Sequence, residues 1–217
     1  MIYPLAKRLT DLVLSIFALL ILAPLMLLIA IQIKSGTSGP VFYRGERAGR
    51  NGCVFRIIKF RSMVADAELK GGSSTAIDDP RLTRTGRFLR KYKLDELPQF
   101  FNVIVGDMSL VGPRPQVLFY TSKYTDEELL ILSVRPGITD LASLYFSDMD
   151  SVLGSGDVDA RYATEVEPVK NILRLQYVRE QSYILDIRIL VETAFKLIGF
   201  ERVTGLKISS SGSRNNG

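Results

Sequence analysis

The residues of this sequence best suited to chemistry are two adjacent acids, Asp95 and Glu96, in the stretch Leu-Asp-Glu-Leu-Pro-Gln at 94–99. An acid pair at a helix start is most often a cap and a complement to the helix dipole, which stabilises the helix by about 0.3 to 2 kcal/mol. Many flanking cations favour a second interpretation, because acids among Lys and Arg side chains are typical of a site for a metal ion and a polyphosphate. These cations include Lys59, Arg61, Arg81, Arg84, Arg87, Arg90 and Arg114.

Two local elements must hold these groups. A short helix is predicted to begin with Asp95 as its N-cap, to take Pro98 in its first turn, where the missing N–H costs nothing, and to end at Gly106. The Gly-Pro-Arg-Pro sequence at 112–115 predicts a stiff turn that fixes the direction of Arg114. The apolar stripe expected on this helix consists of Phe100, Phe101 and Ile104, with Leu97 as a further candidate.

The composition excludes several kinds of site. The 217 residues contain no histidine, which removes Ser-His catalysis, histidine general bases and histidine metal ligands. A metal site must therefore be built from oxygen ligands, which favours Mg²⁺. Cys53 is the single cysteine, so one chain can form no disulfide, which fits a reducing cytosol. The net charge of +5 suits phosphate substrates or anionic lipid; no nucleic-acid-binding motif is present, and we expect no nucleic-acid partner.

Residues 12–33 form an almost wholly apolar run that is long enough for a membrane helix. Pro24 lies in the middle of this run and is expected to kink the helix. Both flanks are positive, so the positive-inside rule favours both ends on the cytoplasmic side. A single spanning helix and a re-entrant helix that returns to the side it entered from are the two interpretations. The flanking cations are Lys7 and Arg8 before the run, and Lys34, Arg44, Arg47 and Arg50 after it.

These features occur together, in the same order, in a known family. The chain resembles the small monotopic phosphoglycosyl transferases of the bacterial sugar transferase family over roughly residues 4–200. It departs from the family at Ala23, where relatives often have Ser, and at 140–143, which bears on sugar or acceptor contacts more than on the chemistry. The matching features are the basic start, the apolar run with its proline, and the segments 59–63, 78–81, 94–99, 106–115 and 135–139.

The resemblance implies an enzyme that transfers a phospho-sugar from a UDP-sugar to polyprenyl (undecaprenyl) phosphate and releases UMP, as the first membrane step of polysaccharide or glycoconjugate assembly. It implies that Asp95 attacks the phosphorus bearing the sugar in a ping-pong mechanism, and that Glu96 binds Mg²⁺. An ionised carboxylate needs no base, which suits a chain without histidine. The expected phosphate-binding residues are Arg90 and Arg114, with Lys59 and Arg61 as further candidates.

The resemblance also implies a re-entrant helix that breaks at Pro24, in the bacterial inner membrane, with the catalytic domain on the cytoplasmic face and in contact with membrane lipids. A homodimer is compatible with this interpretation. Two other functions stay open. A membrane-bound scaffold would explain the apolar run and the basic surface, but gives no reason for acids among arginines. An Asp/Glu-dependent phosphohydrolase would use the same acids with water as the acceptor.

The expected fold is α+β and mainly helical, with a membrane helix at 1–34, a compact cytosolic catalytic domain with amphipathic surface helices at 35–205, and a disordered tail at 206–217. Strands at 41–44 and 53–58 are expected to form a β-hairpin. The helix at 183–199 is amphipathic and is expected to pack on the core, with the membrane surface as the alternative. Further expected elements are helices at 63–70, 82–92, 126–132 and 168–181, a loop at 71–75 and a turn at 135–139.

Overall fold

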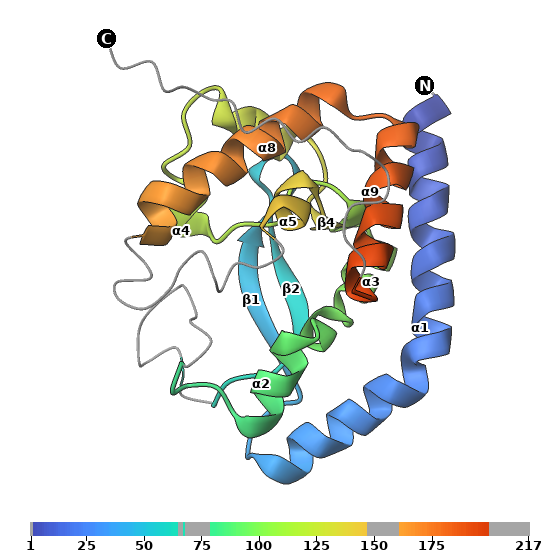
Figure 1. Ribbon diagram of the computed structural model, residues 1–217, viewed down its shortest axis with the longest axis vertical. Helices are drawn as coiled ribbons and strands as arrows, with labels where there is room; N and C mark the ends of the chain where they lie inside the picture. The colour runs from blue at the N-terminus through green and yellow to red at the C-terminus, as the bar shows by residue number, and fades with distance from the viewer. Residues whose placement is uncertain (1, 65–66, 68–78, 147–160, 200–217) are drawn as a thin grey trace.

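The computed structural model describes residues 2–64, 67, 79–146 and 161–199, and it is mainly helical with little sheet (Figure 1). This confirms the expected fold class. The α-helices are α1 (Ile2–Gly36), α2 (Arg84–Lys91), α3 (Gln99–Val105), α4 (Leu118–Thr121), α5 (Leu141–Tyr145), α8 (Glu167–Glu180) and α9 (Tyr183–Leu197). The strands are β1 (Phe42–Ala48), β2 (Val54–Phe60), β3 (Ser109–Val111) and β4 (Gly137–Thr139). Short 3-10 helices lie at Arg50–Gly52, Leu94–Glu96 and Glu128–Ser133, and a π-helical turn at Tyr162–Val166.

Helix α1 is long and apolar enough to cross a membrane by its length and composition. It continues through Pro24 as one helix, whereas the resemblance implied a break there and the proline itself only a kink. Figure 1 shows that the helix is instead bent: its first part runs beside α9, and its last part turns beneath the body of the protein. Proline lacks the N–H that bonds one turn back and its ring crowds that turn, so a bend without a break is the expected physical outcome.

Both halves of α1 contact the rest of the protein. In the second half, Met26, Ile29 and Ile33 are buried in an apolar cluster with Phe60 of β2 and Leu89 of α2. In the first half, polar side chains make the contacts, and these are described with the site below. Helix α1 is therefore held against the rest of the protein on both sides of its bend.

The predicted β-hairpin is confirmed, and its strands are longer than expected. Strands β1 and β2 pair antiparallel from Phe42 opposite Phe60 to Ala48 opposite Val54. Helix α3 is fastened to β2 by Asn102, whose Oδ1 accepts from the Ile58 amide at 2.9 Å and whose Nδ2 donates to the Arg56 carbonyl at 2.9 Å. This fixes the register between α3 and the end of β2.

The segment predicted as a turn at 135–139 contains a strand instead. Strand β4 pairs parallel with β3, with Ser109 opposite Gly137 and Val111 opposite Thr139. The pairing needs a very close backbone approach, since a Cβ on Gly137 would lie 2.1 Å from the Gly112 nitrogen. The sequence pattern misses this strand because its partner lies far away in the chain and the strand itself is only three residues long.

Helix α9 packs on the body through apolar residues, as expected, but two of its acids, Asp186 and Glu192, are also buried. Its buried residues are Asp186, Ile189 and Glu192, whereas Ile184 and Leu197 are each 66% exposed. Ile189 lies in the main apolar core, so the expected core contact is present. The outward apolar residues also leave a surface suited to a membrane interface.

The remaining helix predictions have mixed outcomes. The helices predicted at 82–92 and 168–181 are found as α2 and α8. The one predicted at 126–132 is a 3-10 helix at Glu128–Ser133. Most of the helix predicted at 63–70, all of the loop predicted at 71–75 and the predicted tail at 206–217 lie outside the described residues.

Candidate active site

The acid pair lies in the 3-10 turn Leu94–Glu96, directly before α3. The residue that caps this turn is Lys93, in the left-handed conformation with φ of 56°, so the prediction of Asp95 as N-cap is wrong. Helix α3 begins at Gln99 after Pro98, and Gly106 ends it with φ of 98°, as predicted. The acid pair therefore lies inside a continuous run of helical backbone, and the Asp95 side chain is free of a capping role.

Asp95 is a buried carboxylate that lacks hydrogen-bond donors among the described residues. The residue is 5% exposed, and no described residue donates a hydrogen bond to it. Burial raises the pKa of Asp95 above its ordinary value, and the neighbouring charge of Glu96 raises it further. The cations Lys59, Arg90 and Arg114 act in the opposite direction. A poorly solvated carboxylate with open lone pairs is well suited to nucleophilic attack.

Glu96 has the opposite environment. Its Oε1 accepts from Lys59 Nζ at 3.0 Å and from Arg114 Nη2, so one oxygen holds two cations. Burial alone would raise the pKa of Glu96, but Arg114 and Lys59 outweigh burial and hold the pKa well below its ordinary range. Glu96 is therefore ionised throughout the neutral range, and its Oε2 accepts no hydrogen bond from the described residues.

Each of the two cations is positioned by a buried polar residue. Lys59 follows Ile58, whose amide is held by Asn102 from α3, so the lysine faces the turn at which α3 begins. The Arg114 amide donates to Asp140 Oδ2 at 3.1 Å, and Asp140 Oδ1 also caps α5 by accepting from the Ser143 amide at 2.7 Å. The sequence analysis assigned no role to Asn102, and it noted Asp140 only as the start of the segment that departs from the family.

The other two predicted phosphate-binding residues have different positions. Arg90 lies near the end of α2, is partly buried, and acts electrostatically on Asp95. Arg61 is 6% exposed and donates to the Ser38 carbonyl at 2.6 Å and to Thr37 Oγ1 at 2.6 Å. Its guanidinium is hydrogen-bonded to the residues that follow α1, so the structure gives no support to Arg61 as a substrate ligand.

The predicted apolar stripe of α3 is only partly correct. The buried residues of the helix are Gln99, Asn102 and Val103, whereas Phe101 is 44% exposed. The inward face carries polar residues because α3 packs against α1 and β2, where Asn102 meets backbone groups. A buried Asn next to a strand can be found by structure but not by hydrophobic periodicity.

A family model described as bacterial sugar transferase matches residues 2–199. The chain belongs to the bacterial sugar transferase family. This confirms the resemblance drawn from the motifs, and it confirms the expected class of enzyme, a sugar transferase, at the level of the family. The matched residues include the acid pair, all the cations around it and helix α1.

Three relatives indicate the range of the family. The chain is 37% identical to a UDP-glucose:undecaprenyl-phosphate glucose-1-phosphate transferase of Escherichia coli (strain K12), with 88% of the chain but 40% of the relative covered. It is 36% identical to an uncharacterized sugar transferase of Bacillus subtilis (strain 168), with 91% of the chain and 89% of the relative covered. It is 39% identical to a putative undecaprenyl-phosphate N-acetylgalactosaminyl 1-phosphate transferase of the same strain, with 73% and 79% covered.

The acid pair of this sugar transferase supplies too few ligands for a hard cation by itself, and a substrate would have to supply others. No group of three or more acids or cysteines in the described ranges could hold a metal ion by itself. Magnesium commonly uses one or two carboxylates together with phosphate oxygens and water. Glu96 Oε2 and the Asp95 carboxylate are both open for such a ligand set, whereas Glu96 Oε1 is taken by Lys59 and Arg114.

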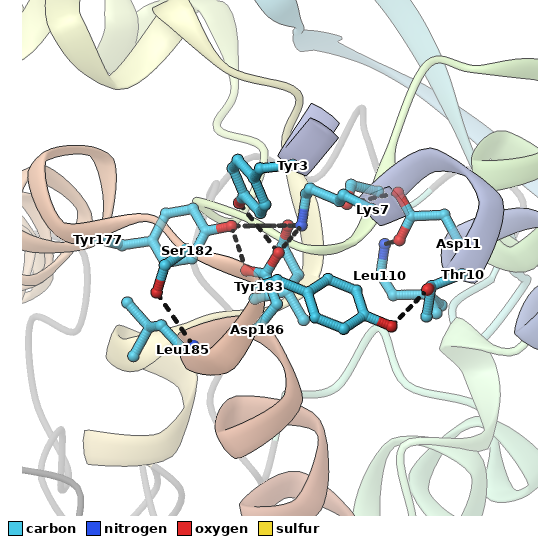
Figure 2. Close-up of polar contacts among 12 residues, drawn as sticks. Tyr3, Lys7, Thr10, Asp11, Leu110, Tyr177, Ser182, Tyr183, Leu185 and Asp186 are labelled. Carbon is cyan, nitrogen blue, oxygen red and sulfur yellow. Dashed lines mark hydrogen bonds and ion pairs between the residues drawn. The ribbon is translucent and has the colours of Figure 1, made fainter. Parts of the chain in front are cut away.

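The predicted membrane-flanking residues Lys7 and Arg8 make protein contacts. Lys7 belongs to a buried polar cluster between α1, β3, α8 and α9, shown in Figure 2 and called here the helix-docking cluster. Arg8 donates to the Val103 carbonyl at 2.7 Å and the Ile104 carbonyl at 2.9 Å, at the C-terminal end of α3. The helix-docking cluster consists of Tyr3, Lys7, Asp11, Tyr177 and Asp186.

The acids of the helix-docking cluster are fully provided with donors. Asp186 Oδ2 accepts from Lys7 at 2.7 Å and from Tyr3 at 3.0 Å, and its Oδ1 accepts from Tyr177 at 2.7 Å. Asp11 accepts from the Leu110 amide at 3.0 Å and from a serine hydroxyl of β3 at 2.8 Å (Figure 2). The cluster therefore joins the start of α1 to the strand that leads to Arg114. The predicted role of Lys7, Arg8 and Pro24 at a membrane stays a prediction.

Proposed function

We propose that this protein transfers a phospho-sugar from a UDP-sugar to a polyprenyl phosphate such as undecaprenyl phosphate and releases UMP. The observation that carries the proposal is the acid pair: a buried carboxylate without protein donors stands next to one held by two cations. The printed names of relatives point the same way, since they name undecaprenyl phosphate as the acceptor. These names differ in the sugar, so the proposal does not extend to which sugar is transferred.

In the proposed first half-reaction, an Asp95 oxygen attacks the phosphorus that bears the sugar. A new bond forms between that oxygen and phosphorus, the bond from phosphorus to the bridging oxygen breaks, and UMP leaves with the electron pair. In the second half-reaction, a phosphate oxygen of the polyprenyl phosphate attacks the same phosphorus. The bond to Asp95 then breaks and the carboxylate returns, so no base is required at either step.

The cations around Glu96 supply the electrostatic part of this mechanism. The diphosphate and the attacking carboxylate are both negative, so their approach needs positive charge placed before the reaction begins. Lys59 and Arg114 are fixed by Glu96, and Arg90 adds charge on the Asp95 side. Mg²⁺, bound by Glu96 Oε2 and substrate phosphate oxygens, would neutralise further charge on the diphosphate.

A screen of nucleotide sugars tests the proposal. Purified protein with polyprenyl phosphate and Mg²⁺ should release UMP from a UDP-sugar, and acceptor should raise the steady-state rate. Release of UMP at a rate that acceptor does not change would instead indicate a phosphohydrolase. No UMP from any nucleotide sugar, with folded protein, would reject catalysis and favour a membrane-bound scaffold.

We also propose that α1 is re-entrant and that the catalytic body lies on the cytoplasmic face of the bacterial inner membrane. A nucleotide sugar is a cytosolic substrate, so the active site must face the cytosol. The ion pair of Lys7 with Asp186, at 2.7 Å, supports an N-terminus on that same side. A bend at Pro24 leaves about a dozen residues of the apolar run before it and fewer after it, and each arm is too short to cross a core of about 30 Å.

Cysteine labelling tests this topology. The single cysteine, Cys53, is exposed, so a Cys53→Ser background with a new cysteine at Ile2 reports the N-terminus alone. An impermeant reagent should label this variant in inverted vesicles and not in intact cells. Replacing Pro24 with Leu should straighten α1 and move the label toward the outside. Labelling of the Pro24 protein in intact cells would reject the re-entrant arrangement.

A further inference from the structure

Lys170 is a buried cation in α8 with an incomplete set of partners. The residue is 9% exposed, and its ammonium donates to Tyr162 Oη at 3.3 Å. The ring centroids of Tyr162 and Phe146 lie 4.7 Å and 5.7 Å from the nitrogen. An ammonium group has three donors, and the described residues give this one a single hydrogen bond and no ion pair. Lys7, by comparison, meets three acceptors.

The acids near Lys170 are already used by other groups. Glu167 Oε1 accepts from Arg174 at 2.8 Å and from Gln116 at 2.7 Å. Asp140 accepts two backbone amides, one of them from Arg114. The charges that face Lys170 are therefore mostly unfavourable. Burial, with the positive charges of Arg174 and Arg114, lowers the pKa of Lys170 to about 7, and Glu167 and Asp140 only partly compensate.

The surroundings of Lys170 connect directly to the active site. Gln116 follows Arg114 by two residues, and its Nε2 donates to Tyr162 Oη at 3.2 Å, the same hydroxyl that Lys170 contacts. Asp140, which holds the Arg114 amide, is also among the charges that act on Lys170. Lys170 thus lies on the Arg114 side of the acid pair, and sequence analysis placed it only within a predicted helix.

We propose that Lys170 is a phosphate-binding residue that acts together with Arg114 on a phosphate group of the substrates. The inference rests on the proposed function and adds a residue to that site. A phosphate offers several acceptor oxygens, which would complete the hydrogen bonds of the ammonium, and its negative charge would offset the repulsion between Lys170 and Arg114. The phosphate can belong to the nucleotide or to the polyprenyl acceptor, and the two sources are separated by experiment.

The test compares Lys170→Met with wild type by measuring the KM of the polyprenyl phosphate and the inhibition constants of UMP and uridine. Loss of a buried charged hydrogen bond predicts an effect of about 10- to 100-fold on whichever constant reports the phosphate. A change in UMP inhibition, with uridine unchanged, assigns the nucleotide phosphate. A change in acceptor KM assigns the acceptor phosphate. Unchanged values of both, or an equal loss for UMP and uridine, would overturn the proposal.

Two further variants separate binding from a structural role. Lys170→Arg keeps the charge and should retain most of the phosphate affinity that Lys170→Met loses. Lys123→Met is the matched control, because Lys123 also lies over an aromatic ring, at 3.7 Å from the Phe119 centroid, but is exposed. It should leave all three constants unchanged. If it alters them as much as Lys170→Met does, the effect is one of general charge and the proposal fails.

If Lys170→Met does not fold, the proposal can still be tested on the wild-type protein. Brief acetylation near neutral pH, followed by peptide mass spectrometry, measures the reactivity of each lysine. Saturating UMP or polyprenyl phosphate should protect Lys170 and not Lys123. Equal labelling of Lys170 with and without both compounds would overturn the proposal. If wild type releases no UMP from any nucleotide sugar, the proposed function fails first, and this result is distinct from a failure at Lys170.

Discussion

The protein contains two buried clusters that both combine acids with cations and differ in their hydrogen bonding. In the helix-docking cluster, both oxygens of Asp186 accept hydrogen bonds, and Lys7 donates to three acceptors. In the candidate active site, Asp95 accepts none from the described residues, and Glu96 uses only Oε1. One cluster is closed by protein groups, and the other leaves oxygens open.

The difference separates a structural role from a chemical one. A buried polar group without a partner costs about 1 to 3 kcal/mol, so an open carboxylate in the interior reduces stability unless a ligand completes it. The helix-docking cluster avoids this cost and holds α1 on the body. The acid pair leaves oxygens unpaired and therefore lowers stability, which is expected where activity requires unpaired groups. Changes in the two clusters should therefore separate activity from stability.

The largest effect on rate is expected at Asp95. Asp95→Asn keeps the shape of the side chain but removes the attacking charge, so turnover should fall by at least about 10³-fold, as for other lost nucleophiles. Folding and membrane binding should persist. Wild type incubated with the right nucleotide sugar and no acceptor should gain one phospho-sugar mass on a peptide that contains Asp95. Initial rates that give intersecting double-reciprocal lines, with no adduct, would indicate direct transfer instead of a ping-pong reaction.

Glu96→Gln should lower the rate by about 10²- to 10³-fold, because the group that orients Lys59 and Arg114 and that would bind Mg²⁺ loses its charge. The dependence of the rate on Mg²⁺ concentration should shift toward higher concentrations. Excess chelator should stop the wild-type reaction. Wild-type activity that persists in excess chelator would contradict the proposed metal role while leaving the role of Asp95 untouched.

The helix-docking cluster should respond in stability. Lys7→Met leaves Asp186 buried without its cation, which typically costs about 3 to 5 kcal/mol. Arg179→Met is the matched control, because its ion pair with Glu127 is exposed on both sides and should contribute about 0 to 1 kcal/mol. Denaturation in a fixed detergent measures both. A loss in Lys7→Met no larger than in the control would show that Tyr3 and Tyr177 alone keep Asp186 satisfied.

Much of the fold follows from local sequence. The hairpin and the helices α2, α8 and α9 follow from hydrophobic periodicity and turn residues, and the motif order identifies the family. The structure also brings together the acid pair and Lys59, Arg90 and Arg114, which were singled out by type and spacing, and their roles stay predictions. Each of these features is decided by residues close together in the chain, which is where pattern analysis is informative.

The errors lie where distant contacts decide the outcome. Asp186 of α9 is buried, and not exposed as its charge predicts, because it meets Lys7, 179 residues earlier in the chain. Arg61 is directed toward the segment after α1 because the Thr37 and Ser38 carbonyls take its donors, and its predicted contact with phosphate stays a prediction. Asp95 is not an N-cap because the helical backbone begins before it, after the left-handed Lys93. Periodicity and spacing contain no information on such pairings.

The smallest expected effect is a pH dependence of opposite sign at the two members of the acid pair. The pKa of Glu96 is lowered in the folded protein by Arg114 and Lys59, so its contribution to stability is present above its unfolded pKa and is lost as the pH falls below about 4.5. The pKa of Asp95 is raised by burial, so its charged form destabilises the folded protein at neutral pH, and this penalty disappears as the pH falls through the raised pKa.

Asp95→Asn should therefore be more stable than wild type near pH 7, and Glu96→Gln less stable. Denaturation of both variants and wild type between about pH 3.5 and 7 should show the advantage of Asp95→Asn shrinking toward acid, because protonation makes Asp95 resemble its amide, whereas the deficit of Glu96→Gln should persist down to about pH 4.5 and begin to shrink only below it. Asp95→Asn less stable than wild type at pH 7 would mean that Asp95 has protein donors after all, and that the open and closed clusters do not differ in the way described above.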